Sequence, residues 1–414
     1  MRLIIIGSGI AGYSACRAAL ETSPDVEVVV VTNETGALYS PCVLPHYLSG
    51  QIPRKHVLIP MDYGKDVSRT RWIVQSTVTA IDRERKVISL DHETLAYDSL
   101  ILAVGGYSVT PPIPGVDLPG VFHCKTLSDA DKLIAWPAKK AVVVGAGPIG
   151  VEVATALASR GMQVSLIELK EQVFPAVLDY SPAQVVQKLL AEVGIQVMVG
   201  ERVECVVGKH RVEAVLTTKG RISADLVVFA VGISPAVKIA KEAGLRIGQT
   251  GGIETDPFLK TSDPHIWACG DCVETNDALT RLAALNMLWP NAKSQGSIAG
   301  VNAAGGRKMY HGSLSCLAIS VLETFVFSFG ATSQSLPGCI VREKETGRGI
   351  VRYLMQNGRV AGVQIIGDDS WAGNITSTIL NPDRLWRLKP DSIRKHLRFH
   401  IPYSSKLMEL VGDS

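Results

Sequence analysis

The chain has 414 residues, of which 46% are hydrophobic and 20% charged, and its formal net charge is +3. This length exceeds one ordinary hydrophobic core, so we expect two or three domains. The small, scattered positive charge argues against nucleic acid or an anionic membrane surface as a partner. The sequence contains no apolar run of about eighteen residues, so we expect no membrane insertion.

Eight cysteines lie at irregular spacing along the chain. Secreted disulfide frameworks occur in short chains, so this pattern favours a reducing compartment, and we expect the protein to be cytoplasmic. The first residues are similar to a signal peptide, with Arg2 followed by an apolar run. That run is short and ends at Gly7, and the glycines that follow it have a better explanation.

A short buried strand over residues 3–6 leads into Gly7, Gly9 and Gly12, and a helix-like segment follows. In this spacing the first glycine permits a tight turn and the second lets the backbone approach a pyrophosphate. The third lets the helix pack closely on the strand, with its N-terminus towards the phosphates. One such match also fits a plain turn between a strand and a helix.

The same pattern recurs at Gly145, Gly147 and Gly150, and the strand after its helix ends at Glu168. An acid about 20 residues past the glycines is where the hydroxyls of a ribose diol donate their hydrogen bonds. Two such units in one chain predict two nucleotide sites, one in each of two domains.

Residues 72–106 alternate apolar and polar side chains, which predicts an antiparallel meander that ends in a buried strand before Gly105. Residues 224–235 repeat that ending before Gly232. Residues 261–274 predict a strand that runs into Gly270 and Asp271.

In this order, the segments resemble the FAD- and NAD(P)-dependent pyridine nucleotide-disulfide oxidoreductases over nearly the whole chain. The resemblance implies an α/β fold with two doubly wound Rossmann-type nucleotide-binding domains, for FAD and NAD, and a C-terminal α+β interface domain. It places the FAD-binding domain at 1–110 and 240–308, the NAD-binding domain at 111–239 and the interface domain at 309–414.

The resemblance also assigns the FAD contacts. Asp271 matches the residue that binds the ribitol chain, and residues 289–306 match a helix whose N-terminus points at the flavin pyrimidine ring. The family's ribose-binding acid falls at Thr32, so Asn33 or Glu34 must serve instead, and Val104 replaces a common threonine. The expected FAD-binding residues are Gly7, Gly9, Ile10, Ala11, Gly12, Asn33, Glu34, Gly105, Gly270, Asp271, Asn291 and Ala292.

For the second nucleotide, Glu168 favours NADH over NADPH because a carboxylate repels a 2′-phosphate, although Lys170 lies close by in the sequence. Glu152 matches a family glutamate that lies near the nicotinamide, or it is an exposed helical acid. The expected NAD-binding residues are Gly145, Gly147, Pro148, Ile149, Gly150, Glu152, Glu168 and Gly232.

The disulfide-reductase branch of this family carries a Cys-x4-Cys redox pair, but Tyr47 stands five residues after Cys42. A lone cysteine here resembles the single-cysteine branch of coenzyme A-disulfide reductases, NADH oxidases and peroxidases, and polysulfide reductases. The run from Cys42 through Leu44, Pro45 and Tyr47 to Gly50 is most similar to the coenzyme A-disulfide reductase type. Cys42 is therefore expected to be a catalytic thiol, or else a buried filler.

Oxidases and peroxidases of the branch resemble one another in a histidine inside the first glycine turn, where this chain has Ile10, so oxygen or peroxide is disfavoured. His46 is a possible substitute base on the helix face of Cys42, or a surface histidine. Cys269 and Cys272 form a Cys-x-x-Cys without further ligands nearby, so we interpret them as packing residues and expect no metal site.

From about residue 309 the pattern changes to strands, with an Asn-Gly hairpin turn expected at 356–359, a short helix at 371–380 and a tail that contains Tyr403. This region resembles the family's interface domain, which implies a homodimer.

The predicted function is an FAD-dependent NAD(H) oxidoreductase that passes electrons from NADH to a small disulfide or polysulfide through Cys42. The alternative is an electron-transfer subunit of a larger iron-sulfur complex, such as an anaerobic 2-oxoacid:NAD oxidoreductase, in which a protein is the acceptor. The chain has no cluster-ligand run of its own, so such clusters would belong to partners.

Overall fold

A computed structural model describes residues 1–61, 68–346, 349–356 and 359–367. The chain folds into two compact units. Of the described residues, the first unit contains those within 1–42, 54–107 and 233–314, and the second contains those within 43–53, 108–232 and 315–367. The C-terminal strands therefore cluster with the second glycine turn, and the expected division into three domains stays a prediction.

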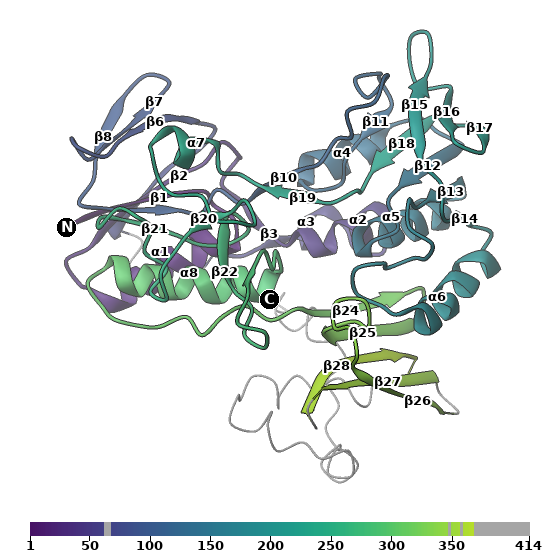
Figure 1. The fold of residues 1–414 in the computed structure, drawn as a ribbon. Coiled ribbons are helices and arrows are strands. Elements are labelled where there is room, and N and C mark those ends of the chain that lie inside the picture. The colour runs from purple at the N-terminus through teal and green to yellow at the C-terminus, as the bar shows by residue number, and fades with distance from the viewer. Residues whose placement is uncertain (62–67, 347–348, 357–358, 368–414) are drawn as a thin grey trace. The chain divides into compact units, whose positions relative to one another are not determined.

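The first unit is built on a five-stranded parallel sheet in the order β21-β9-β1-β2-β5 (Figure 1). Ile4 of the central strand β1 pairs with Val29 on one side and Leu100 on the other. Strands buried on both faces need continuous apolar sequence, which is why residues 3–6 are all buried. The strands are β1 (Arg2–Ile6), β2 (Glu27–Val31), β5 (Thr70–Ile73), β9 (Ser99–Leu102) and β21 (Ile266–Ala268).

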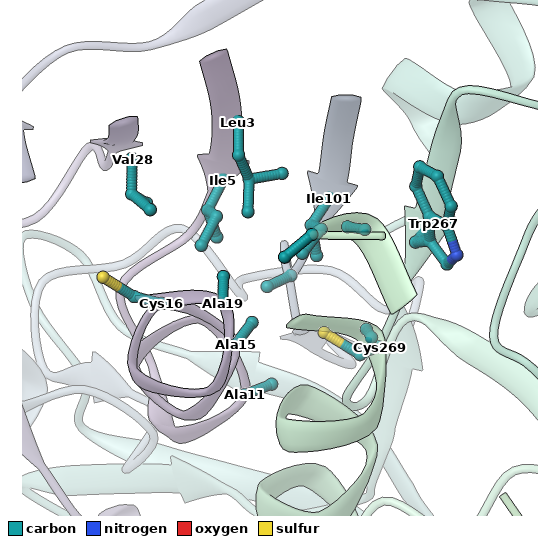
Figure 2. Close-up of a cluster of buried hydrophobic side chains, with 14 of the residues drawn as sticks. Leu3, Ile5, Ala11, Ala15, Cys16, Ala19, Val28, Ile101, Trp267 and Cys269 are labelled. Carbon is teal, nitrogen blue, oxygen red and sulfur yellow. The ribbon is translucent and has the colours of Figure 1, made fainter. Parts of the chain in front are cut away.

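Helices α1 (Ile10–Thr22) and α8 (Trp289–Ala303) pack against each other and against this sheet. Figure 2 shows Ala11, Ala15 and Ala19 of α1 beside the apolar side chains of the strands. The two helices approach backbone to backbone, because a Cβ atom on Gly296 would lie 2.1 Å from the carbonyl oxygen of Ala11. Small residues on both helices make this close packing possible.

The sheet's other core cluster includes the antiparallel meander of β6 (Val78–Asp82), β7 (Val87–Leu90) and β8 (Thr94–Ala96). The meander predicted from residue 72 onward was wrong at its start, because Trp72 lies in β5 of the parallel sheet. Trp72 pairs with Val30 of the apolar strand β2. The neighbouring strand therefore decides which sheet this segment joins, and the alternation of apolar and polar residues around Trp72 does not. The shorter elements of this unit are β3 (Leu38–Tyr39), α3 (Arg54–Val57), β4 (Leu58–Ile59), α7 (Lys238–Glu242), β19 (Ile233–Pro235), β20 (Ile253–Glu254), β22 (Val273–Asn276) and β23 (Ala283–Ala284).

The second unit repeats this plan with a parallel sheet in the order β11-β18-β12-β13-β14. Its glycine turn again follows the central strand, and a second antiparallel meander follows the edge strand β14. The sheet contains β11 (Val121–Phe122), β12 (Lys140–Val144), β13 (Gln163–Ile167), β14 (Gln196–Met198) and β18 (Leu226–Phe229). The meander contains β15 (Val203–Val207), β16 (Ala214–Thr217) and β17 (Gly220–Ser223), and the helices are α2 (Leu44–Ser49), α4 (Leu127–Ala135), α5 (Pro148–Ser159) and α6 (Tyr180–Glu192).

The C-terminal strands of the second unit form an antiparallel sheet in the order β24-β25-β28-β27-β26, and α6 packs against β28. Gln356 and Arg359 pair across the expected hairpin, but the turn between them lies outside the described residues. The helix expected at 371–380 and the tail with Tyr403 also lie outside them. The strands are β24 (Cys316–Val321), β25 (Thr324–Gly330), β26 (Ile340–Thr346), β27 (Gly349–Gln356) and β28 (Arg359–Ile366).

Across the described parts of the chain, no helix combines the length and the apolar character needed to cross a membrane.

Candidate functional site

The first glycine turn joins β1 to α1 and depends on two glycines for its shape. Gly7 has a φ of +110°, and a Cβ atom there would lie 2.1 Å from the carbonyl oxygen of Ala103. A Cβ atom on Gly12 would lie 2.0 Å from the carbonyl oxygen of Gly7. Neither position can hold a side chain unless the backbone moves.

Gly9 is different, because a Cβ atom there would meet no protein atom within 4 Å. It is the N-cap of α1 and provides no side-chain cap, so the first N–H groups of the helix have no side-chain acceptor at this position. Ile10 and Ala11 are the first two residues of that helix. The open space at a helix N-terminus is suited to an anion, so this turn fits the pyrophosphate of FAD.

The second turn repeats this geometry between β12 and α5. Gly145 has a φ of +99°, and a Cβ atom on Gly150 would lie 1.8 Å from the carbonyl oxygen of Gly145. Gly147 is the N-cap of α5, and a Cβ atom there would meet nothing within 4 Å. Pro148 and Ile149 begin the helix, and proline suits this place because its missing N–H would have no partner there. This turn therefore fits a second pyrophosphate, that of NAD.

Glu168 follows β13 directly, and its side chain is buried against the second turn. Its Oε2 accepts a hydrogen bond from the N–H of Ala146 at 2.8 Å, and its Oε1 accepts one from the N–H of Lys170 at 2.9 Å. A carboxylate has further lone pairs, so these two bonds still leave acceptors for a ribose diol. Glu168 thus fixes the middle of the glycine turn and remains the candidate for the ribose contact.

The corresponding position of the first unit is Thr32, which is also buried. The hydroxyl of Ser8 donates to Thr32 Oγ1 at 2.9 Å, and the N–H of Glu34 donates to the same oxygen at 3.2 Å. Asn33 and Glu34 are exposed, and Glu34 Oε2 accepts a hydrogen bond from the hydroxyl of Tyr39 at 2.8 Å. The ribose contact of Asn33 or Glu34 stays a prediction.

Gly105 and Gly232 occupy matching places, shortly after the ends of β9 and β18. Their φ angles are +67° and +120°, and a Cβ atom on either would meet nothing within 4 Å. Both lie just beyond the carboxyl ends of parallel strands, where open α/β sheets bind their ligands.

Gly270 and Asp271 follow β21, and Gly270 has a φ of +83°. The N–H of Gly270 donates to Gln295 Oε1 of α8 at 2.8 Å. Gln295 is buried, and its amide nitrogen lies 3.2 Å from Ser313 Oγ. Gln295 was not predicted from the sequence, where its only signal is a long polar residue among the small residues of α8.

Asn291 and Ala292 lie in the first turn of α8 and are both buried. Asn291 Nδ2 donates to the carbonyl oxygen of Leu314 at 3.0 Å, and its Oδ1 accepts from the N–H of Leu314 at 3.3 Å. The side chain of Asn291 therefore holds the loop that ends the first unit. The FAD contacts expected of both residues stay predictions.

Glu152 lies in α5, two residues after Gly150, and is partly buried. Burial raises the pKa of its carboxyl from its ordinary 4.5 to about 8. The interpretation of Glu152 as an exposed helical acid was therefore wrong, since its surroundings disfavour the charged form.

Cys42 is the only exposed cysteine of the eight, all of which lie in the described part of the chain. It lies in a 3₁₀ turn, η1 (Pro41–Val43), just before α2. The interpretation of Cys42 as a buried filler was therefore wrong. Burial raises the pKa of five other thiols: to about 12 for Cys16, Cys124 and Cys272, to about 11 for Cys316, and well above its ordinary value for Cys269.

His46 lies in α2, whereas Cys42 precedes that helix, so the two residues do not share the face of one α-helix. His46 Nδ1 lies 2.6 Å from Gln51 Oε1. Cys269 and Cys272 are fully buried in the hydrophobic core, as expected of packing residues. The described residues contain no group of His, Cys, Asp or Glu side chains arranged to hold a metal ion.

The family model of the pyridine nucleotide-disulphide oxidoreductases matches residues 1–296. The chain is 36% identical over 402 residues to an NADH oxidase of Methanocaldococcus jannaschii, covering 91% of this chain and 89% of that protein. It is 30% identical over 341 residues to the CoA-dependent NAD(P)H sulfur oxidoreductase of Pyrococcus furiosus, covering 80% and 76%. A solved NAD-dependent persulfide reductase from A. fulgidus matches with a TM-score of 0.89 at 29% identity, covering 97% of this chain and 80% of that one.

Proposed function

This chain belongs to the pyridine nucleotide-disulphide oxidoreductase family and is an FAD-dependent NAD(P)H oxidoreductase, and we propose that its acceptor is a small disulfide or polysulfide that reacts at Cys42. The single exposed thiol carries this proposal, because disulfide exchange needs a sulfur that the substrate can reach. The names of two similar proteins, a sulfur oxidoreductase and a persulfide reductase, support the same acceptor class.

In the proposed site the two glycine turns bind and orient the two nucleotides. The turn at Gly7, Gly9 and Gly12 holds the pyrophosphate of FAD, and the turn at 145–150 holds that of NADH. When bound, FAD accepts a hydride equivalent from NADH and passes its two electrons on. Glu168 accepts hydrogen bonds from the ribose diol and excludes a 2′-phosphate, so NADH is preferred to NADPH.

The thiolate of Cys42 attacks one sulfur of the substrate disulfide, which forms a mixed disulfide and releases the other half as a thiolate. The two electrons that came from NADH then break the mixed disulfide, which restores the Cys42 thiolate and releases the second thiol. The balance is one NADH, one proton and one disulfide consumed for one NAD⁺ and two thiols formed.

The test is Cys42→Ser, since a serine hydroxyl stays protonated near neutral pH and cannot form the mixed disulfide. We expect NADH-to-dye electron transfer to stay within about twofold of the wild type, because flavin reduction needs no sulfur. Reduction of coenzyme A disulfide or polysulfide should fall by more than about 1,000-fold, the scale of losing a nucleophile. Cys339→Ser, at a partly buried thiol, is the matched control and should retain both activities.

Full activity of Cys42→Ser with disulfides would contradict the thiol mechanism. The hypothesis that the protein is an electron-transfer subunit would then be preferred, and a protein acceptor would take electrons directly from the flavin. Co-purification of iron and further polypeptides would support the subunit hypothesis, whereas purification as a homodimer without other components would support an enzyme that acts through Cys42. Rapid oxygen consumption by the same variant would instead identify oxygen as the acceptor, despite Ile10 in the first turn.

A further inference from the structure

The middle residue of the second glycine turn, Ala146, is held from two sides. Its N–H donates to Glu168, and its carbonyl oxygen accepts a hydrogen bond from the N–H of Phe174 at 2.8 Å. A trans peptide is planar, so fixing the carbonyl of Ala146 also fixes the direction of the N–H of Gly147, on the opposite side. Gly147 is the N-cap of α5, so Phe174 helps to orient the backbone that faces the proposed pyrophosphate.

Phe174 holds this bond at a cost to its own backbone. It is fully buried and has a φ of +50°, in the left-handed region that aromatic residues rarely adopt. Such a conformation persists only where the surrounding structure determines it.

Phe174 belongs to a largely buried loop, residues 172–179 (the bridging loop), which connects the glycine turn to the C-terminal sheet. Within it, the N–H groups of Val177 and Leu178 donate to the carbonyl oxygen of Phe174, each at 3.0 Å. Gln172 Nε2 donates to the carbonyl oxygen of Leu178 at 2.7 Å. The loop is thus a compact unit in which a displacement at one end is transmitted to the other.

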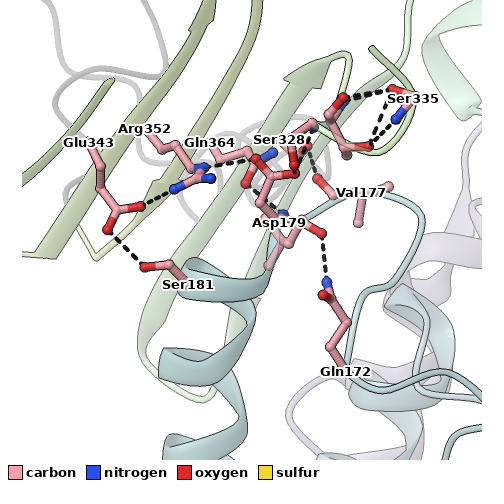
Figure 3. A network of polar contacts seen from close by, with 12 residues as sticks. Gln172, Val177, Asp179, Ser181, Ser328, Ser335, Glu343, Arg352 and Gln364 are labelled. Atoms are coloured by element: carbon pink, nitrogen blue, oxygen red, sulfur yellow. Dashed lines mark hydrogen bonds and ion pairs between the residues drawn. The ribbon is translucent and has the colours of Figure 1, made fainter. Parts of the chain in front are cut away.

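The far end of the bridging loop is Asp179, which is buried and attached to three strands or loops of the C-terminal sheet region (Figure 3). Its Oδ2 accepts a hydrogen bond from Arg352 Nε of β27 at 2.8 Å, and its Oδ1 accepts one from the N–H of Ser333 at 2.8 Å. Its own N–H donates to Gln364 Oε1 of β28 at 2.8 Å.

Three further hydrogen bonds strengthen this attachment. Ser328 of β25 donates its hydroxyl to the carbonyl oxygen of Val177. Arg352 also donates to Glu343 of β26, whose other carboxylate oxygen accepts from Ser181 at the start of α6 at 2.8 Å. A buried charge that loses its partner is costly, so the ion pair of Asp179 with Arg352 strongly favours this one arrangement.

We propose that Asp179, through its ion pair with Arg352, is a positioning residue for NADH, and that the C-terminal sheet sets the conformation of the NADH pyrophosphate turn through the bridging loop. The inference deepens the proposed function and rests on it, because it requires NADH to bind at the second turn. Hydrogen bonds and the connecting backbone form a continuous path from Arg352 through Asp179, the bridging loop and Phe174 to Ala146. Among the described residues, Asp179 makes no hydrogen bond to the turn itself, so its effect must pass through that loop.

The first experiment measures NADH affinity and turnover in Asp179→Asn, which keeps the shape but removes the charge. We expect the Kd and KM for NADH to rise about tenfold, while kcat at saturating NADH and the FAD content stay within about twofold. A merely structural role would lower the folded fraction or kcat and leave the Kd of the folded protein unchanged. Arg246→Gln is the matched control, because it breaks an exposed arginine–glutamate pair in the first unit and should change neither value.

The second experiment measures amide hydrogen exchange of the wild-type holoprotein with and without NAD⁺, which needs no variant. Coupling between two sites is reciprocal, so NAD⁺ should slow exchange in residues 172–181 and also in β27 and β28. An at least threefold slowing in these strands supports the proposal. Slowing confined to the glycine turn and α5 would overturn it, even if Asp179→Asn failed to fold.

The two proposals fail in different ways. If the wild-type protein gave no saturable binding of NADH, the proposed function would be wrong and this inference would fall with it. If the wild-type protein bound NADH and Asp179→Asn bound it equally well, the coupling alone would be refuted.

Discussion

The two glycine turns have nearly the same backbone but are held in different ways. In the first turn, Ser8 contacts a threonine hydroxyl, and its carbonyl receives no backbone N–H bond among the described residues. In the second, the corresponding Ala146 is held by a carboxylate and by the N–H of Phe174. The shared glycines fix the conformation of each turn. We infer that the residues around the turn decide which nucleotide binds there and which other parts of the chain are coupled to that binding.

The bracing of the two turns also differs. Helix α1 packs backbone to backbone on α8, where the added Cβ atoms of Gly296 and Gly300 would each lie 2.1 Å from a carbonyl oxygen of α1. Such close packing leaves little room for adjustment, which suits a cofactor that stays bound. The second turn is held through a loop with a strained residue, which suits a substrate that arrives and leaves in each cycle.

The largest effects are expected at the third glycine of each turn. Gly12→Ala should remove FAD from the purified protein and lower the free energy of unfolding by about 3 kcal/mol or more, because the methyl group would clash with a carbonyl oxygen. Gly150→Ala should leave FAD in place and raise the KM for NADH by more than about 50-fold. Flavin absorbance, urea denaturation and steady-state kinetics would check these outcomes.

The second glycine of each turn supplies the matched control. A methyl group on Gly9 or Gly147 would meet no protein atom, so Gly9→Ala and Gly147→Ala should unfold within about 1 kcal/mol of the wild type. Each should still weaken its own nucleotide about tenfold, because the methyl group enters the space assigned to the pyrophosphate. Unchanged affinities for both nucleotides would show that the phosphates lie elsewhere.

A smaller effect is expected when the carboxylate of the second turn is altered. In Glu168→Gln, the amide can accept only one of the two backbone N–H bonds and no longer repels a phosphate. We expect the KM for NADH to rise about tenfold and the preference for NADH over NADPH to shrink by a similar factor. Thr32→Val, at the corresponding position of the first unit, should change FAD affinity by less than about threefold. An unaltered NADH preference in Glu168→Gln would show that Glu168 only holds the turn.

The sequence was informative where geometry demands a particular residue. Gly7, Gly12, Gly145 and Gly150 could be assigned because no other residue fits their backbone and close contacts, and family membership confirms the fold. Parallel strands such as β1, β9 and β12 could be predicted from their continuous apolar runs. Trp72 could not be placed, because its partner strand and not its own pattern decides which sheet it joins.

Contacts between segments that are distant along the chain could not be predicted from the sequence. Gln295 holds Gly270, and Asp179 meets Arg352, which lies 173 positions later in the sequence; no local pattern encodes these hydrogen bonds. The exposure of Cys42 and the burial of Glu152 are likewise properties of the folded chain. In each case a residue type that is common on surfaces acquires its role from what packs around it.

The smallest effect concerns Glu152 of α5, which corresponds to Ser14 of α1 when the two turns are aligned by their glycines. Burial raises the pKa of Glu152 to about 8, so the folded protein holds a proton there that the unfolded chain releases near its ordinary 4.5. Stability from this group is therefore fully present below about pH 4.5 and is lost as the pH rises through about 8. The slope of the unfolding free energy against pH has an upper limit of about 1.4 kcal/mol per pH unit. Because the side chain is only partly buried, we expect a total loss of about 1–2 kcal/mol.

Glu152→Gln should remove this loss, so the stability advantage of the variant over the wild type in urea denaturation should grow from pH 5 to pH 8.5. Glu242→Gln, at an exposed acid of α7, should run parallel to the wild type, and a Glu152→Gln curve that also ran parallel would show that Glu152 is charged in the folded protein at neutral pH.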